Sequence, residues 1–499
     1  MLAFAKSTLR LHLTCAFFAI GSFVWGYHVG VLSSVLVHPG FTDALGSPTA
    51  AQKGLVTAIY YLGTWFSYIF ASSPLADALG RRYAALAGTA IVAVGTGFEA
   101  GASVPSAYAM FIIGRIISGI GVAILSTSVP LYQSEVSPAV QRGRYVVLNH
   151  IGFVVGLAAG FWVGYAVTFW QNDAHQVYVS WRVSIAVVLV PCVIFACGLP
   201  FLPETPRWLV DHGHYHRAQW SLHWFREGSY TDEEIKAEFD KIQISVQDQR
   251  DSKPIWLSLF THRDLFDRLW RASLLQFMSQ MCGATAMKYY LPTLLGKLGV
   301  PTRITLLIGG IESTSKIAMT VVEMLIIDKV GRRTTLVAGS TAMGIGMLMN
   351  AVLGEIYPEN QNRAADVACI VFIFVYALGY SMGFGPASWV YGSEIFPTAV
   401  RARGLNFSAS GGAIGSIVVA QVWPVGIERI GSRIYFFFFA INVICVPIIF
   451  LFYPETKGRA LEDIDGLFSK VLNRQEHNGN QGQSEIAITQ ERDDGSSIS

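Results

Sequence analysis

The sequence predicts an all-α membrane protein with twelve transmembrane helices in two six-helix repeats and a small intracellular helical domain between them. Three observations predict this fold class. Hydrophobic residues make up 52% of the 499-residue chain and charged residues only 14%, whereas soluble domains carry about 25% charged residues. The chain contains twelve apolar stretches of the length that spans a bilayer, roughly 20 residues. Several charged motifs of the first half also return in the second half.

The returning motifs keep a nearly constant spacing. The hexapeptide D-x-x-G-R-R occurs at 77–82 and again at 328–333, which is 251 positions later, and the tripeptide P-E-T at 203–205 returns at 454–456 with the same offset. Glu135, which is followed by arginines at 142 and 144, returns as Glu394 with arginines at 401 and 403, an offset of 259. Three such pairs predict an internal duplication.

The twelve candidate spans divide evenly between the two repeats. In the N-terminal bundle, residues 1–202, they are 12–36, 54–74, 84–102, 108–130, 145–168 and 182–201. In the C-terminal bundle, residues 266–456, they are 268–295, 304–327, 334–353, 366–391, 405–427 and 434–453. The first span lacks a small-residue cleavage site and is longer than a signal peptide, so we expect it to be retained.

Two polar segments complete the chain. Residues 203–265 are predicted to form an intracellular block of two or three short amphipathic helices. Thr205-Pro206 has the pattern of a helix start with proline in the first turn, and Thr231 with Glu234 has the spacing of a capping box. Residues 457–499 are polar and partly acidic, and we expect them to be a disordered cytoplasmic tail.

Charge and motif content narrow the function. Basic residues cluster in the loops that would share one side of the membrane, which predicts that both termini are cytoplasmic; the plasma membrane is the expected location. The net charge of +2 is too small to predict a nucleic-acid partner. The six cysteines lack metal-ligand or disulfide spacing. No nucleotide-binding loop or nucleophile motif occurs, so we expect no enzyme activity, cofactor or metal, and a monomer in the lipid bilayer.

Five motifs together carry a family resemblance. Gly114-Arg115, the hexapeptide P-L-Y-Q-S-E at 130–135, Arg142-Gly143-Arg144, the segment 203–207 and the doubled D-x-x-G-R-R resemble the sugar porter family of the major facilitator superfamily, and fungal sugar porters most of all. The resemblance covers about residues 15–458. It implies two six-helix bundles around a central cavity that opens alternately to each side, and an intracellular helical domain. Repeated halves with a ligand site between them near the membrane midplane agree with this.

The resemblance also implies a charged gate on the cytoplasmic side. In the family, acids at the cytoplasmic ends of helices pair with the arginines of the D-x-x-G-R-R loops and hold the inner side shut. Charges that pair in one state and separate in the other bias a two-state equilibrium. An alternative is that these charges only anchor loops and set topology. The predicted gating residues are Asp77, Arg81, Arg82, Glu135, Arg142, Asp328, Arg332, Arg333, Glu394 and Arg401.

The transport site is where the sequence departs from the family pattern. The family's Q-Q-x-x-G-x-N stretch in the seventh span stands here as S-Q-M-C-G-A-T at 279–285, so hydroxyls replace most amides. The proline–tryptophan element of the tenth span survives at 385–389. A sugar site needs side chains that hydrogen-bond hydroxyls and an aromatic surface for the sugar ring. The predicted substrate-binding residues are His150, Ser279, Gln280, Thr285, Lys316, Trp389 and Ser416.

Lys316 is the most unusual of these residues. A lysine inside a span is costly and should face a cavity or a partner. Glu312 lies four residues before Lys316 and Glu323 seven after it, so all three share one helix face. Lys316 either pairs with Glu312 beside a wet cavity or contacts a substrate oxygen, such as a carboxylate. For Lys288, which lies beside two tyrosines, we expect an orientation towards the outer face.

The energy source is the last open question of the sequence. Proton-coupled sugar porters typically carry an aspartate in a G-Y-D-x-G-V stretch of the first span, where this chain has G-Y-H-V-G-V at 26–31. The partner arginine is retained as Arg115. His28 titrates near neutral pH when unperturbed, so His28 and Arg115 are the coupling candidates. Facilitated diffusion is nevertheless the simpler expectation, because the carboxylate is absent at position 28.

The sequence therefore predicts a secondary transporter that moves a sugar or sugar-like solute by alternating access. Replacement of the amides leaves two alternatives open. One is a carrier for a polyol, an organic acid or a secondary metabolite. The other is a sensor that binds sugar without transporting it, although sensors of this family usually add a longer cytoplasmic tail.

Overall fold

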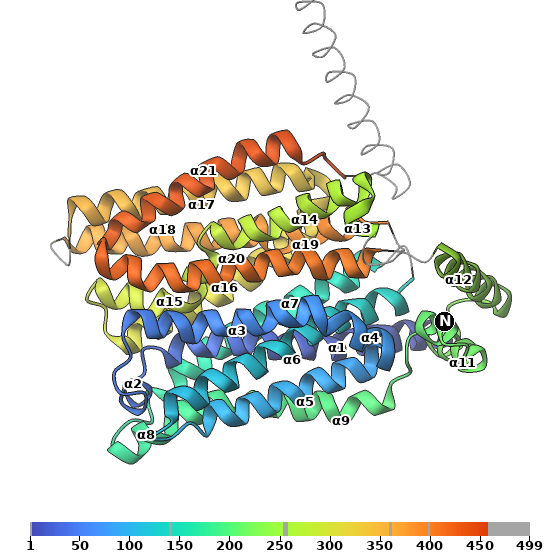
Figure 1. Cartoon of the computed structure of the whole chain (residues 1–499), viewed down its shortest axis with the longest axis horizontal. Helices are drawn as coiled ribbons and strands as arrows, with labels where there is room; N and C mark the ends of the chain where they lie inside the picture. The colour runs from blue at the N-terminus through green and yellow to red at the C-terminus, as the bar shows by residue number, and fades with distance from the viewer. Residues whose placement is uncertain (1, 139–141, 253–257, 359–361, 398–399, 458–499) are drawn as a thin grey trace, which may run out of the picture.

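The computed structural model describes residues 2–138, 142–252, 258–358, 362–397 and 400–457. Two groups of long helices lie side by side, with the first half of the chain in one group and the second half in the other (Figure 1). The helices of the first group are α1 (Leu2–Val35), α2 (Pro39–Ala44), α3 (Ala50–Phe70), α4 (Ser72–Leu79), α5 (Arg81–Ala100), α6 (Ala107–Val136), α7 (Arg142–Val167), α8 (Ala174–Ala186), α9 (Leu189–Gly198) and the 3₁₀ turn η2 (Leu199–Phe201).

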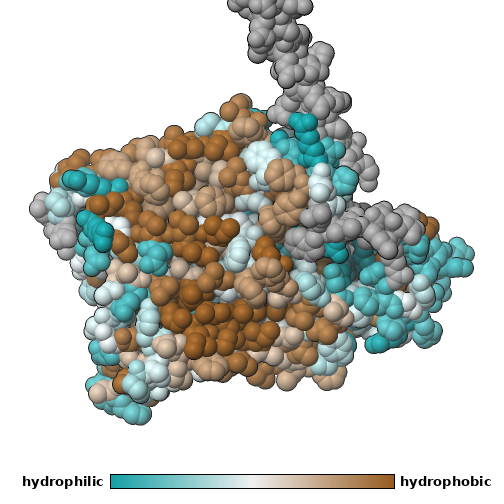
Figure 2. All heavy atoms as spheres, viewed as in Figure 1, coloured by the Kyte–Doolittle hydropathy of each residue, from teal (hydrophilic) through white to brown (hydrophobic). Residues whose placement is uncertain are grey.

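The second group repeats this plan. Its helices are α14 (Arg263–Met281), α15 (Ala284–Lys297), α16 (Thr302–Val330), α17 (Arg332–Ile356), α18 (Arg363–Met382), α19 (Phe384–Ile395), α20 (Arg401–Arg429), the turn η3 (Gly431–Arg433) and α21 (Ile434–Phe452). Apolar side chains form a broad band across the bundle, and hydrophilic ones gather at its two ends (Figure 2). A membrane-spanning orientation follows from this distribution, since only apolar side chains tolerate the hydrocarbon core.

The spans agree with the predicted twelve-helix arrangement. Among the described residues, ten helices are long and apolar enough to cross a membrane, and the bent pair α3 and α4 raises the number to eleven. The remaining predicted span, 268–295, is divided between α14 and α15. It falls outside this set because α14 carries several charged residues and α15 has only 14 residues.

Gly283 makes the break between α14 and α15. Its φ of 103° lies in the left-handed region, which glycine adopts without the steric cost that other residues incur. The carbonyl oxygen of Cys282 next to it accepts hydrogen bonds from Asn442 Nδ2 at 3.1 Å and from the Tyr376 hydroxyl at 3.2 Å. Discontinuous helices are a common way to present polar groups in a membrane, and this break places Gln280 and Thr285 on either side of it.

The block between the two groups holds, among its described residues, three helices and one short turn of helix: α10 (Pro206–Asp211), α11 (Tyr215–Arg226), α12 (Asp232–Ser252) and α13 (Ser258–Thr261). The expected capping box forms, because the backbone N–H of Thr231 donates to Glu234 and the N–H of Glu234 donates to the Thr231 hydroxyl. The predicted helix start at Thr205-Pro206 is confirmed, because Thr205 is the N-cap of α10 and Pro206 is its first residue. The Thr205 hydroxyl does not cap the helix and donates to Glu135 instead.

Arg226 fixes this block to the N-terminal bundle. Its guanidinium is buried, makes two 2.9 Å bonds to Glu238 of α12, and donates to the carbonyl oxygen of Val136 at the end of α6 at 3.0 Å. A buried bidentate pair of this kind is geometrically specific. The block and α6 are therefore held as one unit.

Candidate functional site

A cavity lies between the two bundles. It has a volume of about 90 Å³ and is lined by side chains of α1, α3 and α7 from the first half and of α14, α15, α16, α18, α19 and α20 from the second. Its polar and aromatic lining residues are Trp25, Tyr61, Thr64, Tyr68, His150, Phe153, Gln276, Gln280, Lys288, Lys316, Tyr380, Ser381, Trp389 and Ser416. A cavity between two repeated bundles is the usual position of a transport site.

Aromatic rings form one part of the wall. The ring of Trp25 lies 4.5 Å from that of Phe153 and 6.4 Å, edge to face, from that of Trp389. Trp25 and Phe153 belong to the first half, whereas Trp389 belongs to the second. Faces of this kind stack against the C–H side of a saturated ring, and their contact changes when the two halves move.

Polar groups around the helix break at Gly283 form another part of the cavity wall. The amide oxygen of Gln280 accepts from the Thr285 hydroxyl at 3.0 Å and from Lys288 Nζ at 3.4 Å, while its Nε2 donates to Ser279 at 3.1 Å. Thr285 Oγ1 also lies 3.2 Å from Ser416 Oγ. The amide of Gln280 is thus held in one orientation, and a preorganised donor–acceptor group binds a ligand at lower entropic cost.

Two lysines line the cavity. Lys316 Nζ lies 2.6 Å from Glu312 Oε1, so the ion pair expected from their spacing forms. Lys288 has no acidic partner among the described residues; its ammonium lies near Gln280 and 5.1 Å from the centroid of the Tyr380 ring. The expected outward orientation of Lys288 is wrong, because the break at Gly283 turns the start of α15 towards the cavity.

The structure sorts the predicted substrate residues into two layers. His150, Gln280, Lys316, Trp389 and Ser416 line the cavity. Ser279 and Thr285 are buried behind Gln280 and hold its amide rather than facing the cavity. Sequence reasoning missed several lining residues, among them Trp25, Tyr61, Thr64, Phe153, Gln276, Lys288 and Tyr380; only the spacing of Gln276, four residues before Gln280, could have indicated one of them.

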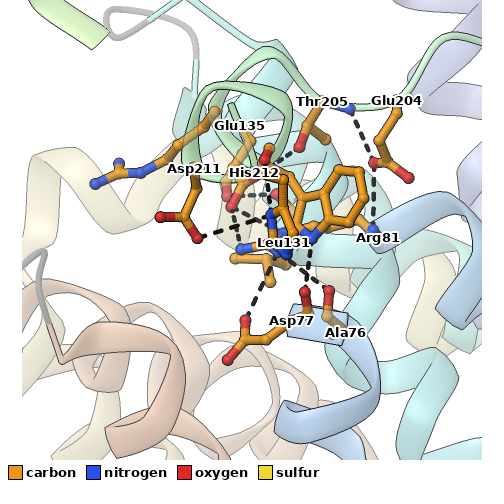
Figure 3. Close-up of polar contacts among 12 residues, drawn as sticks. Ala76, Asp77, Arg81, Leu131, Glu135, Glu204, Thr205, Asp211 and His212 are labelled. Carbon is orange, nitrogen blue, oxygen red and sulfur yellow. Dashed lines mark hydrogen bonds and ion pairs between the residues drawn. The ribbon is translucent and has the colours of Figure 1, made fainter. Parts of the chain in front are cut away.

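The charged motifs of the first half meet at the end of the bundle where the α10–α12 helices lie (Figure 3). Arg81 donates to Glu135 Oε1 from Nε at 3.1 Å, and its Nη1 lies 3.6 Å from Asp77. Glu204 accepts from the backbone N–H groups of Arg81 at 3.2 Å and Arg82 at 3.0 Å, at the N-terminus of α5. Thr205 donates to the other oxygen of Glu135 at 2.6 Å. Burial raises the pKa of Glu204, although the backbone donors oppose that shift.

The second half repeats the glutamate contacts of this network. Arg332 Nη2 donates to Glu394 Oε1 at 2.7 Å, and Thr456 donates to Glu394 Oε2 at 2.6 Å. Glu455 accepts from the backbone N–H groups of Arg332 at 2.9 Å and Arg333 at 3.0 Å. In each half the arginine–carboxylate bond joins residues of that half. The side chains of Arg142 and Asp328 lie outside the described residues, and Arg401 donates to the carbonyl oxygen of Phe396 at 3.2 Å.

A second buried cluster surrounds the coupling candidates. His28 and Arg115 lie together, with Nδ1 of the imidazole 3.5 Å from Nη1 of the guanidinium. Glu99, near the end of α5, brings a carboxylate to both: its Oε2 is 3.9 Å from Arg115 Nη1 and 4.0 Å from His28 Nδ1. Sequence reasoning missed Glu99, because nothing in its neighbourhood along the chain marks it as the partner of a residue in another helix.

The described residues contain no group of three His, Cys, Asp or Glu side chains able to hold a metal ion.

Comparison with known proteins identifies the family. The profile described as "Sugar (and other) transporter" matches residues 14–468. The chain belongs to the sugar transporter family. It is a multi-pass membrane transporter and not an enzyme.

Curated relatives align along nearly the whole transporter. This chain is 29% identical over 465 residues to the MFS-type transporter criB of Aspergillus cristatus, and the alignment covers 92% of this chain and 94% of the relative. It is also 29% identical over 481 residues to a protein of Aspergillus niger named "Probable quinate permease", covering 92% and 88% of the two chains.

The fold has solved counterparts. The structure of the proton:xylose symporter XylE bound to 6-bromo-6-deoxy-D-glucose matches with a TM-score of 0.77 at 22% identity, covering 93% of this chain and all of that one. The likeness confirms the twelve-helix major facilitator fold of the transporter.

Proposed function

We propose that the transporter carries a solute with a saturated, polyhydroxylated ring, a sugar or a close analogue, by alternating access. The observation that carries this proposal is the cavity that both halves line, with Trp25 and Trp389 from opposite halves 6.4 Å apart. A solute in the cavity beside these two rings contacts both halves at once. Binding can therefore favour one arrangement of the halves over another, which a solute site on one half alone could not do.

Hydrogen bonds would give selectivity within this class. Gln280, Ser416 and His150 offer donors and acceptors to ring hydroxyls from three different helices. A site built to bond hydroxyls discriminates strongly against analogues that lack them, because its buried polar groups are then left unpaired.

Inter-bundle contacts would provide the gate. Asn406 of α20 reaches across to the first half, accepting from Thr127 at 3.0 Å and donating to Ser73 at 2.5 Å. These bonds must break when the halves separate on that side. The bonds from Arg81 to Glu135 and from Arg332 to Glu394 each join helices of one half, so we propose that they keep each half rigid while the inter-bundle bonds open. This assigns the predicted gating residues to stiffening the moving bodies.

Uptake into proteoliposomes tests the function. Radiolabelled D-glucose, D-xylose, glycerol and quinate are offered to reconstituted transporter, with exchange against internal solute measured as well. We expect at least one ring solute to enter. Trp389→Ala should weaken its apparent affinity about tenfold through loss of ring stacking, whereas Trp220→Ala, which changes an exposed tryptophan of α11, should not. If none of the four solutes is taken up or exchanged, the result would contradict the proposal and favour a sensor.

A second candidate substrate class is a carboxylated polyol. Lys288 favours it, because a cationic group that lines the cavity and lacks an acidic partner among the described residues would find one in a carboxylate. The relative named for quinate is consistent with such a substrate.

Lys288→Met separates the two classes. If the solute is anionic, its apparent affinity should fall at least tenfold while affinity for D-glucose changes little; if the solute is neutral, quinate should not enter at all. Lys297→Met serves as control, since Lys297 lies on the same helix but outside the cavity lining.

We also propose that both termini face the cytoplasm of a plasma-membrane protein that works as a monomer. The basic loops and the intracellular block support this orientation. Protease accessibility of a tag on the N-terminus in sealed right-side-out vesicles would test it, because a cytoplasmic tag should resist external protease.

A further inference from the structure

We propose that Glu99 is the proton-carrying carboxylate of this transporter, paired with Arg115, and that solute movement is coupled to a proton through it. This inference rests on the proposed transport function. It replaces the expectation of facilitated diffusion, which depended on the absence of a carboxylate at position 28. In three dimensions the carboxylate is present, and it comes from α5 instead of α1.

Three buried side chains from three helices form the proposed site inside the first bundle. Glu99, His28 and Arg115 come from α5, α1 and α6, and each is no more than 2% exposed. Glu99 Oε1 accepts from the Ser118 hydroxyl at 2.8 Å. Helix α6 makes room for the acid at Gly114, where a Cβ atom would lie only 2.7 Å from Glu99 Cγ.

The hydrogen bonds of His28 define its tautomer. The Thr96 hydroxyl donates to the carbonyl oxygen of Val92 at 2.9 Å, so it can only accept from His28 Nε2 at 3.0 Å. The imidazole therefore carries its hydrogen on Nε2. Nδ1 is left as an acceptor that faces Arg115, and His28 is a neutral bridge in this site rather than the group that carries charge.

Glu99 only partly satisfies Arg115. Nη1 lies 3.9 Å from the carboxylate, and the guanidinium stacks 4.1 Å from the centroid of the Tyr60 ring. Nε and Nη2 have no hydrogen-bond partner within the described part of the chain, and neither does the Tyr60 hydroxyl. Buried donors without partners cost free energy, so this guanidinium is poised to gain a new partner when the charge beside it changes.

A candidate partner lies on the other half of the molecule. Tyr289 of α15 stands beside the Arg115 guanidinium, and its own hydroxyl lacks a hydrogen bond of standard geometry among the described residues. Its ring also meets that of Tyr61 edge to face, with centroids 6.1 Å apart. The cluster thus touches the start of the broken helix that carries Lys288 into the cavity.

Protonation of Glu99 would change the balance of this cluster. With Glu99 ionised, the charges of Glu99 and Arg115 cancel. A proton that adds to the carboxylate leaves the guanidinium as an uncompensated buried cation, which favours any arrangement that brings it new acceptors. The Tyr289 hydroxyl can supply such an acceptor, and Tyr289 belongs to the second half. The proton therefore acts on the relative position of the halves, and solute in the cavity acts on the same equilibrium.

No other charged side chain offers the same role on the helices that pack against α5. Helix α6 contributes Arg115 and, at the far end of the helix pair, Glu135, which is bonded to Arg81. On α8, Arg182 donates to the carbonyl oxygen of Ala102 and stacks on aromatic rings, and His175 is exposed. Among the described residues, α9 and η2 contribute no charged group, and Asp77 of α4 lies at the opposite end of α5. His28 of α1, Tyr60 of α3 and Tyr289 of α15 are the other titratable groups beside this pair.

Infrared difference spectroscopy tests the proposal without knowledge of the solute. Purified transporter is compared between acidic and alkaline buffer, and a band of a buried protonated carboxyl should appear at the acidic condition. Glu99→Gln should abolish this band. Glu323→Gln, which changes an equally buried acid of α16, should keep it. A spectrum in which Glu99→Gln removes no titrating band would overturn the proposal.

Transport measurements test the coupling itself. With an inward proton gradient, the wild-type transporter should accumulate the solute among D-glucose and quinate that it carries, and should take up protons with it. Glu99→Gln should lose accumulation entirely and fall to the equilibrium level, yet keep exchange of labelled for unlabelled solute. Glu355→Gln, an acid paired with Arg433 at the end of α17, should accumulate like wild type.

A rescue variant distinguishes a proton site from a structural ion pair. His28→Asp combined with Glu99→Gln moves the carboxylate back to α1, beside the same guanidinium. Accumulation should return in this double variant, whereas a merely structural role for Glu99 predicts no gain. Wild-type protein that equilibrates its solute without proton uptake would refute the coupling and leave the transport function intact. Absence of all uptake and exchange would instead refute the transport function, and the infrared result would still decide the role of Glu99.

Discussion

Removing the positive charge from the Lys316–Glu312 pair should destabilise the transporter strongly. The two side chains are buried, 8% and 1% exposed, and Nζ lies 2.6 Å from Oε1. At an effective dielectric constant of about 20, the gross attraction at that distance is about 6 kcal/mol, most of which offsets the cost of taking both charges out of water. Lys316→Met would leave Glu312 buried without its cation. Breaking such a pair costs about 3–5 kcal/mol.

The loss should be recovered by removing the second charge. In Lys316→Met with Glu312→Leu nothing charged is left unpaired, so stability should return close to that of wild type. The assay is unfolding of purified protein in detergent, followed by proteolysis of the unfolded fraction. A cost of this size raises the unfolding equilibrium constant by about two to four orders of magnitude. The double variant also reports on substrate, because a stable protein with lost solute binding would show that Lys316 contacts the solute directly.

Two results would refute this reasoning. One is a Lys316→Met variant as stable as wild type, which would mean that Glu312 is neutral or solvated in the protein. The other is a double variant no more stable than the single one, which would mean that packing around Lys316, and not its charge, supports α16.

Three further predictions follow from the repeated networks and the interface. Glu394→Gln should weaken the bond from Arg332 and cost about 1–3 kcal/mol of stability, measured by the same unfolding assay; an unchanged value would show that the network is not structural. Gly331→Ala should destabilise by about 1–2 kcal/mol, because φ is 101° there and its Cβ would lie 2.6 Å from a Glu455 oxygen; full stability would contradict this. Asn406→Leu should free the two halves on the side where it bonds Thr127 and Ser73. Faster labelling of a cysteine introduced at Ala123, which packs against Ala409 of α20, is the expected sign; unchanged labelling would argue against the gate.

The sequence by itself determined the architecture, because the signals for it are local or periodic. Apolar stretches of bilayer length define spans without reference to their neighbours. Duplicated motifs reveal the two halves, and the same atoms meet in both: Arg81 with Glu135, and Arg332 with Glu394. The Lys316–Glu312 pair was also predictable, since residues four apart share a helix face.

Only the tertiary structure decided which residues meet across helices. Glu99 and Arg115 are brought together by the rotation and tilt of α5 and α6, and no pattern along the chain encodes those angles. Lys288 faces the cavity, and Thr285 stands behind Gln280, because the helix breaks at Gly283 and changes direction there. Whether a segment spans the membrane depends on its own composition. The direction in which each of its side chains points depends on packing against helices distant in sequence. The absent carboxylate at position 28 was therefore visible in the sequence, and the position of the Glu99 carboxylate beside Arg115 was visible only in the fold.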